Sequence, residues 1–371
     1  MKNLRKNLIN ASSVLILLTL IIFFSSCEDI FNNNITPKGN NKGTYIFVSG
    51  LDHIYGEVYM CDESGKNLTR ISNIISNLPD INALDGDNYP VLSPDNKKVA
   101  FKSLDNNKLM IYNIDDKTLT NIGKVSFGEE SKDVAWSPES DKIAYIEFPS
   151  IKYQIIIKSA DGELKMETRY TSSSFPLYDS VIMFKQIAWH EDGKRILASG
   201  IQNGAYHFYE IDVNSGKIIK GHSFPIYGEF FYRNDTVIFQ STSQMYYANL
   251  KDGTIKPLFN EIIENFTLSP DGQRLAYTVT RDYTYNGNIY KCGDIMAIGL
   301  NGYDKFNLTQ TSDIPDESKS STKKFKPIWI SNTELLYAAG NIYLVKDDFK
   351  PRASILVKDV KAYGQLQFIK K

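Results

Sequence analysis

The sequence predicts an all-β protein built from one short unit that repeats around a ring. Three observations support this prediction. A strand–turn–strand pattern recurs along most of the chain, and the chain contains 23 Tyr and 20 Phe residues, which favour strands. All three tryptophans of the chain also occupy the same position of the repeated pattern: Trp136, Trp189 and Trp329.

The repeated unit has a tight turn followed by an apolar strand. The best preserved turns are Val91–Asp95, Trp136–Glu139 and Leu268–Gly272. The apolar strands after them are Lys98–Phe101, Lys142–Tyr145 and Arg274–Tyr277. Degenerate copies begin at Trp189, Tyr232 and Trp329. In the Ser-Pro-Asp-Gly form, Pro presets φ, Asp bonds its own backbone and Gly supplies a positive φ, so the chain reverses.

A third strand follows each copy, and turn residues such as Asp161-Gly162 and Asn301-Gly302 lead to a short fourth. The third strands are Leu109–Tyr112, Gln154–Ile157, His207–Ile211, Met245–Tyr247, Ile295–Ile298 and Ile342–Val345. Four antiparallel strands in roughly 40–50 residues make one blade of a β-propeller. We therefore expect four-stranded antiparallel blades.

The number of blades follows from the apolar second strands. Thr44–Val48 fits the same slot as the six copies above, which predicts seven blades. Six is the alternative if one degenerate copy is not a blade. The first blade lacks a first strand of its own, and the C-terminal segment Gln365–Ile369 can supply it. Such closure by both ends of the domain removes open sheet edges.

These turns and strands resemble the TolB-like, WD-type propeller repeat, whose hallmark is Trp-Ser-Pro-Asp-Gly before an Ile-Ala-aromatic strand. The resemblance covers nearly all of residues 43–371. It implies the fold but says little about function, because the same blades serve transport scaffolds, peptidase lids and lyases. No copy has the complete hallmark, and the copies at 189, 232 and 329 lack Ser-Pro.

The N-terminus predicts a lipoprotein. Lys2, Arg5 and Lys6 precede the apolar run Val14–Phe24, which ends in Ser25-Ser26-Cys27. This boundary resembles the bacterial lipobox, which implies a signal peptide over 1–26 and lipidation of Cys27. The alternatives are an ordinary cleaved signal peptide and an uncleaved anchor. Residues 27–42 are then a membrane tether, and 43–371 form the propeller domain.

These features predict a monomer in the bacterial cell envelope, held at the outer membrane by its N-terminal lipid. Glu28 and Asp29 follow the cysteine, and whether the protein faces the periplasm or the cell surface stays open. The formal net charge is −1 and no long basic run occurs, so nucleic acid is excluded as an expected partner. The expected partner is an envelope protein, with a glycan as second choice.

The binding face is expected at the end of the ring that carries the long segments, 72–88, 171–182, 281–293 and 310–324. Tyr283, Tyr285 and Tyr290 are the candidate binding residues there, since tyrosine combines a rigid apolar ring with a polar tip. The alternative is an extended hairpin whose tyrosines pack on a neighbouring blade. Asp85 and Asp87 are further candidates in an oxygen-rich stretch without calcium-loop spacing, which favours a solvated turn.

No catalytic, cofactor or metal site is predicted. The Gly-x-Ser-x-Gly motif is absent. The histidines, His53, His190, His207 and His222, are spread along the chain, with His190 expected at the end opposite His53 and His222. The alternative function is an oligosaccharide lyase-like propeller with a site in the central channel. Cys61 and Cys292 suggest two buried thiols, although a single disulfide stays open.

Overall fold

The computed structural model of the chain describes residues 43–49, 57–72, 90–103, 108–124, 134–147, 153–161, 168–171, 182–227, 229–261, 263–285, 288–309, 327–348 and 353–370. The chain divides into two units, Met1–Asn40 and Asn41–Lys371, and all described residues belong to the second. The regular elements in these ranges are strands. None of the described residues forms a helix that could cross a membrane. The described part is all-β, as predicted.

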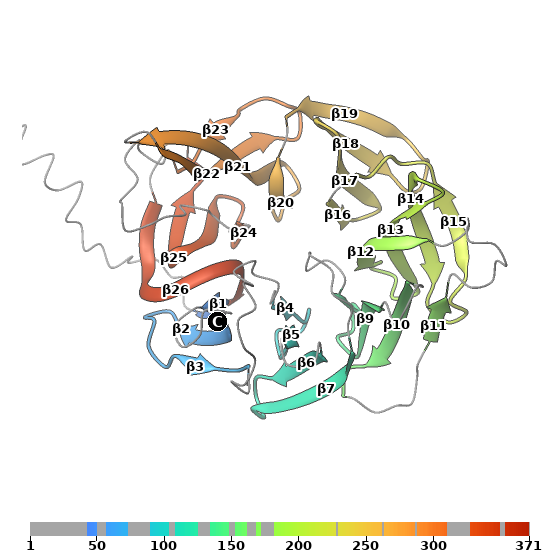
Figure 1. Ribbon diagram of the computed structural model, residues 1–371, viewed down its shortest axis with the longest axis horizontal. Helices are drawn as coiled ribbons and strands as arrows, with labels where there is room; N and C mark the ends of the chain where they lie inside the picture. Colours follow the sequence, from blue (N-terminus) through green and yellow to red (C-terminus); the bar gives the residue numbers. More distant parts are fainter. Residues whose placement is uncertain are drawn as a thin grey trace, which may run out of the picture. The chain divides into compact units, whose positions relative to one another are not determined.

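Five sheets have four antiparallel strands each and follow one another around a ring in chain order (Figure 1). The first contains β4 (Val91–Leu92), β5 (Lys98–Ser103), β6 (Lys108–Asn113) and β7 (Thr118–Lys124). The second contains β8 (Val134–Trp136), β9 (Lys142–Glu147), β10 (Gln154–Ser159) and β11 (Thr168–Thr171). The third contains β12 (Met183–Trp189), β13 (Arg195–Gln202), β14 (Ala205–Asp212) and β15 (Ile218–His222).

The fourth sheet contains β16 (Phe230–Arg233), β17 (Thr236–Ser241), β18 (Gln244–Asn249) and β19 (Ile255–Asn260). The fifth contains β20 (Glu264–Leu268), β21 (Arg274–Tyr285), β22 (Asn288–Gly299) and β23 (Phe306–Asn307). In each of these sheets the strands lie in sequence order. A ring of four-stranded antiparallel sheets is the architecture of a β-propeller.

The sixth sheet has six strands in the order β24-β25-β26-β1-β2-β3. They are β24 (Ile328–Trp329), β25 (Glu334–Lys346), β26 (Ala353–Lys370), β1 (Gly43–Ser49), β2 (Glu57–Asp62) and β3 (Thr69–Arg70). β26 pairs with β1 from Lys370 opposite Gly43 to Ala362 opposite Ser49. The prediction that the C-terminal strand pairs with the first strand is confirmed.

The predicted count of seven blades is not confirmed, because the described strands form six sheets. Gly340 has a φ of +78°. The pattern predicts a turn between the strands Leu335–Tyr337 and Ile342–Val345, and both fall within the span of β25. The rings of Tyr337 and Tyr343 stack with centroids 4.9 Å apart, and Lys346 Nζ lies 3.4 Å from Glu334 Oε1. The pairing of β25 with β26 shifts register between Gly340 and Ile342. The Asp347 N–H donates to Thr333 O at 2.8 Å, so the chain reverses near Gly340 between the two ends of β25.

Apolar side chains fill the interfaces between neighbouring sheets. One cluster joins Ile46 of β1 to Val99 of β5, and another joins Ile295 of β22 to Val345 of β25. Four more clusters join the successive sheets between these two. A further cluster lies within the six-stranded sheet, where Phe47 of β1 packs with β25. Burial of these side chains is the main favourable contribution to folding.

The repeated turns form for local reasons. Ser269 Oγ donates to Asp271 Oδ1 at 2.6 Å and accepts a hydrogen bond from the Arg274 N–H at 3.0 Å. Gly272 follows with a φ of +73°, a conformation that favours glycine. The turn over residues 93–98 makes the same two bonds through its own serine. The serine and the aspartate thus bond groups within their own turn, which explains why the motif repeats.

Candidate functional site

One end of the ring, called here the first end, carries the turns between the first and second strands of each sheet. Hydrogen bonds connect these turns between neighbouring sheets. The backbone N–H groups of Asp95, Asn234 and Asp271 donate to Ser140 Oγ at 3.0 Å, Glu191 Oε1 at 2.9 Å and Asn332 Oδ1 at 3.1 Å. Below these turns, Trp136 Nε1 donates to Val91 O at 3.0 Å and Trp329 Nε1 to Thr267 O at 3.3 Å. The turns of the first end are thus hydrogen-bonded to the turns of neighbouring sheets.

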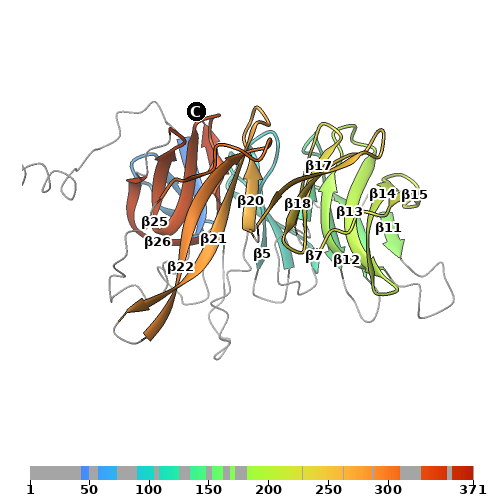
Figure 2. The same cartoon turned by 90° about the horizontal axis from the view of Figure 1, so that it is seen from above.

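The opposite or second end carries a projecting hairpin. β21 and β22 have 12 residues each, whereas β17 and β18 have 6 each. Their ladder continues to Tyr285 opposite Asn288. The inner strand β20 pairs with β21 only as far as Thr278, so the hairpin continues as a two-stranded ribbon. Figure 2 shows this ribbon extending past the ends of the neighbouring sheets.

Residues 281–285 and 288–293 are paired strand residues, so the described part of this segment agrees with the extended-hairpin alternative rather than with a loop. The register places Tyr283 opposite Tyr290, and Tyr285 is two residues further along the same strand. Directly opposed positions and positions two apart share a face of a sheet. The three candidate tyrosines therefore occupy positions on one face of the ribbon.

The remaining sequence candidates lie outside the described residues. These are Cys27, His53, Asp85 and Asp87, together with most of the segments 72–88, 171–182 and 310–324. The predictions made for these residues from the sequence stay predictions.

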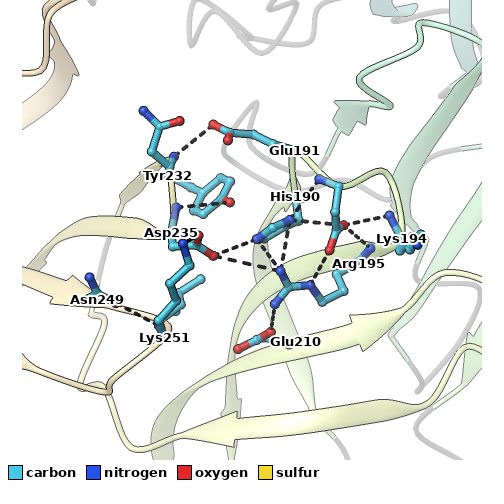
Figure 3. Close-up of polar contacts among 12 residues, drawn as sticks. His190, Glu191, Lys194, Arg195, Glu210, Tyr232, Asp235, Asn249 and Lys251 are labelled. Carbon is cyan, nitrogen blue, oxygen red and sulfur yellow. Dashed lines mark hydrogen bonds and ion pairs between the residues drawn. The ribbon is translucent and has the colours of Figure 1, made fainter.

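The densest polar cluster of the described residues lies in the seam between the third and fourth sheets (Figure 3). Arg195, at the start of β13, donates through Nη1 to Glu210 Oε2 and through Nε to Asp192 Oδ2 at 2.7 Å. His222 Nε2 is 2.8 Å from Glu210 Oε1. His190 Nε2 is 3.1 Å from Oδ1 of Asp235, which belongs to the fourth sheet. We call these six residues the seam network.

The carboxylates of the seam network accept hydrogen bonds that favour their charged forms. Burial alone would raise the pKa of Glu210, but hydrogen bonds from His222 and Arg195 outweigh it and lower the pKa. The pKa of Asp235 is also lowered, first by the hydrogen bond from Lys251, whose Nζ is 2.9 Å away. The Glu210 side chain is 3% exposed and that of His222 is 5% exposed. Glu210 and His222 are therefore shielded from solvent, and the network joins two sheets.

Sequence reasoning misses this network. It predicts His190 and His222 at opposite ends of the ring, but the structure connects them through Arg195 and Glu210. The reason is that the Arg195 side chain starts at the first end and reaches Glu210, which lies further along the sheet opposite Leu197. His222 is also the last residue of β15 rather than part of the inter-sheet connection. The contact between His190 and Asp235 joins residues 45 positions apart, which no local pattern signals.

Two other buried carboxylates are paired. Asp347 accepts from Arg274 Nε and, at 3.2 Å, from Arg274 Nη2. Burial raises the pKa of Asp347, and the nearby guanidinium only partly offsets this effect. Glu57 is buried at the start of β2, and Arg70 Nη1 lies 3.0 Å from its Oε2. The first pair connects the fifth sheet to the six-stranded sheet, whereas both residues of the second pair lie in the six-stranded sheet.

Metal ligands and reactive thiols show no convergence in the described part of the chain. No group there of three His, Cys, Asp or Glu side chains could hold a metal ion. Cys61 is a buried free thiol, and burial raises its pKa to about 12. A thiol with so high a pKa is a poor nucleophile. The Cys292 side chain lies outside the described part.

No protein-family model and no curated protein matches the chain. Solved structures do match. A prolyl endopeptidase structure matches 90% of this chain and 49% of its own, with a TM-score of 0.55 and 12% identity. A putative 6-phosphogluconolactonase from Bacteroides fragilis matches 90% of this chain and 99% of its own, with a TM-score of 0.52 and 12% identity. TolB from Acinetobacter baumannii matches 71% of this chain and 63% of its own, with a TM-score of 0.46 and 17% identity.

The first two likenesses agree with the ring of sheets and show the fold alone, because both identities are 12%. The chain spans about half the length of the prolyl endopeptidase it matches. The propeller scaffold is thus shown, while the activities of these proteins are not transferred to the chain.

Proposed function

We propose that the protein is a non-catalytic lipoprotein of the bacterial cell envelope whose propeller binds a partner protein through its second end. The projecting ribbon of β21 and β22 carries this proposal. The ladder beyond Thr278 has no inner strand beside it among the described residues. A ribbon that extends past its sheet adds little to the core but presents two faces and two strand edges to a partner.

The tyrosine positions give the ribbon its chemistry. Tyr283 and Tyr290 form a directly opposed pair, and Tyr285 shares their face. Tyrosine is enriched in protein interfaces because it adds a large contact area at a low entropic cost. The other face carries the positions of Asp282, Thr284 and Lys291. The two faces therefore differ in chemistry, which allows a matched test.

The test compares two triple variants of the full-length protein. Y283A/Y285A/Y290A removes the tyrosine face, and D282A/T284A/K291A changes the opposite face. Photocrosslinking in cells identifies the partner of the wild-type protein, and capture of that purified partner is then measured for each variant. We expect the tyrosine variant to lose capture at least about tenfold, which corresponds to about 1.4 kcal/mol, and the control to keep it. Equal capture by both folded variants would refute a site on this face.

Membrane attachment is tested separately. We propose that Cys27 becomes the lipidated N-terminus, because Ser25-Ser26-Cys27 ends the apolar run. Mass spectrometry of the membrane fraction is expected to find a lipid-modified Cys27. A Cys27→Ala protein that remains equally membrane-bound would contradict the anchor. Partner capture by the purified domain does not depend on this result.

The six-stranded sheet is counted in this proposal as two blades that share β26. The support for this count is the cluster within that sheet, in which Phe47 of β1 and Leu344 of β25 pack together. Such a cluster resembles those that lie between separate sheets elsewhere in the ring. The proposed propeller then has seven blades.

A further inference from the structure

A second aromatic surface lies at the second end, in the seam between the third and fourth sheets. The rings of Tyr206, in β14, and Tyr227, in the connection after β15, have centroids 4.3 Å apart and planes inclined by 39°. Tyr227 is 53% exposed. The two rings thus form one aromatic pair at the surface, one from each side of the seam.

The backbone holds Tyr227 in place. Phe224 and Ile226, just before it, are almost fully buried. The Ile226 N–H donates to Phe224 O at 2.8 Å, and the Tyr227 N–H donates to Gln240 O at 3.2 Å. The exposed Tyr227 ring leaves apolar surface in contact with water, which is unfavourable. Because the backbone that carries it is fixed, no gain in backbone entropy offsets this cost. Such a preorganised ring is suited to binding a ligand.

The two chain segments that carry the aromatic pair are uncharged, and the nearest charged residues in sequence are Lys185, two residues after Met183, and Glu229, two residues after Tyr227. Met183 and Ile201 extend the pair along one ladder, because Met183 is opposite Ile201 and Ile201 is opposite Tyr206. Residues 201–206 and 223–227 contain no Lys, Arg, Asp or Glu. Asn203, three residues before Tyr206, is an exposed turn residue with a side-chain amide. The surface combines flat apolar rings with uncharged hydrogen-bonding groups.

The size and chemistry of this surface indicate its ligand. A stable protein interface needs roughly 20–30 residues on each side, whereas this surface consists of four apolar side chains and one amide. We propose that the Tyr206–Tyr227 pair binds a neutral saccharide. A pyranose ring places its apolar C–H face against the negative face of an aromatic ring, and its hydroxyl groups bond with the Asn203 amide. This site is separate from the proposed protein-binding ribbon.

The proposal is tested by calorimetric titration of the folded protein with neutral hexasaccharides of glucose, mannose, galactose, xylose and N-acetylglucosamine. We expect at least one to bind at millimolar concentration or below. Tyr227→Ala is expected to weaken that binding at least about tenfold, while Tyr227→Phe keeps most of it. Asn203→Gly is expected to weaken it several-fold, and glycine is chosen because φ at this residue is +52°.

The variants also separate binding from folding. Tyr227 is largely exposed, so Tyr227→Ala is expected to melt within a few degrees of the wild-type protein. Absence of binding by all five hexasaccharides would overturn the proposal, as would unchanged affinity in folded Tyr227→Ala. Tighter, Tyr227-dependent binding of hexagalacturonate would overturn the assignment to a neutral ligand. Loss of partner capture in the ribbon variant affects neither result.

Discussion

The two ends of the propeller differ in how their residues are used. At the first end, repeated turns bond within themselves and to the next sheet, as Ser269 does with Asp271 and as Asp271 N–H does with Asn332. At the second end, one hairpin continues past its sheet, and Tyr227 stays half-exposed on a fixed backbone. The comparison shows that polar groups at the first end bond to one another across the ring, while the second end presents the surfaces for which we propose binding.

The largest expected effect is on ring closure. Removal of residues 364–371 takes from β1 its partners Lys370, Ile369, Phe368 and Gln367. An unpaired edge and an exposed core follow, so the protein is expected to aggregate or to melt many degrees lower. Differential scanning calorimetry measures this change, and removal of residues 28–40 is the control. Equal melting of both truncated proteins would show that β26 does not close the ring.

The next largest effect is expected in the seam network. Glu210→Gln removes the charge that pairs with Arg195 and His222, and loss of one partner of a buried ion pair costs about 3 kcal/mol. Lys220→Ala is the control, because its Nζ lies 3.9 Å from Glu210 and its side chain is 47% exposed. For this control, urea unfolding is expected to show a decrease of no more than about 0.5 kcal/mol in the free energy of unfolding. Comparable losses in both variants would contradict the role given to the network.

A smaller effect is expected for one repeated turn. Ser269→Ala removes the bonds to Asp271 and from Arg274 in a fully buried side chain. The free energy of unfolding is expected to fall by about 1–2 kcal/mol. Thr242→Ala, in an exposed second-end turn, is expected to change it by less than about 0.5 kcal/mol. A larger loss at Thr242 than at Ser269 would reverse the comparison of the two ends.

Acid should separate two carboxylates with opposite pKa shifts. The pKa of Glu210 is lowered, so its stabilisation is present above the usual Glu pKa of about 4.3 and is lost as pH falls through the folded value. The pKa of Asp347 is raised, so the folded state takes up the proton first and gains stability as pH falls. Between neutral pH and about pH 4, the free energy of unfolding should therefore fall less with decreasing pH in Glu210→Gln than in the wild-type protein. In Asp347→Asn it should fall more. Identical slopes would contradict both shifts.

Much of the scaffold can be predicted from sequence because its determinants are local. The Ser-Pro-Asp turns depend on bonds between residues two to five positions apart, and the strands that follow have a plain apolar pattern. The chain reversal near Gly340 follows the same local pattern, since the Asp347 N–H bonds Thr333 O across it, whereas the blade count is not confirmed because strands from both ends of the domain pair into one sheet.

The candidate sites are less predictable for two reasons. The sequence of residues 281–293 fits both a long loop and an extended hairpin, and only the pairing of β21 with β22 distinguishes them. The seam network and the Tyr206–Tyr227 pair join separate elements across a seam. Such contacts depend on how two sheets pack, and no pattern within either strand reports them.

The division of roles between the two ends is tested most directly by measuring stability and partner capture on the same set of single alanine variants. The set covers the first-end turns at 93–98 and 269–274, and the ribbon at 281–291. We expect the first-end variants to lower the melting temperature and leave capture by the folded fraction unchanged. The Tyr283, Tyr285 and Tyr290 variants should lower capture at an unchanged melting temperature. Loss of capture confined to stable first-end variants would contradict the account.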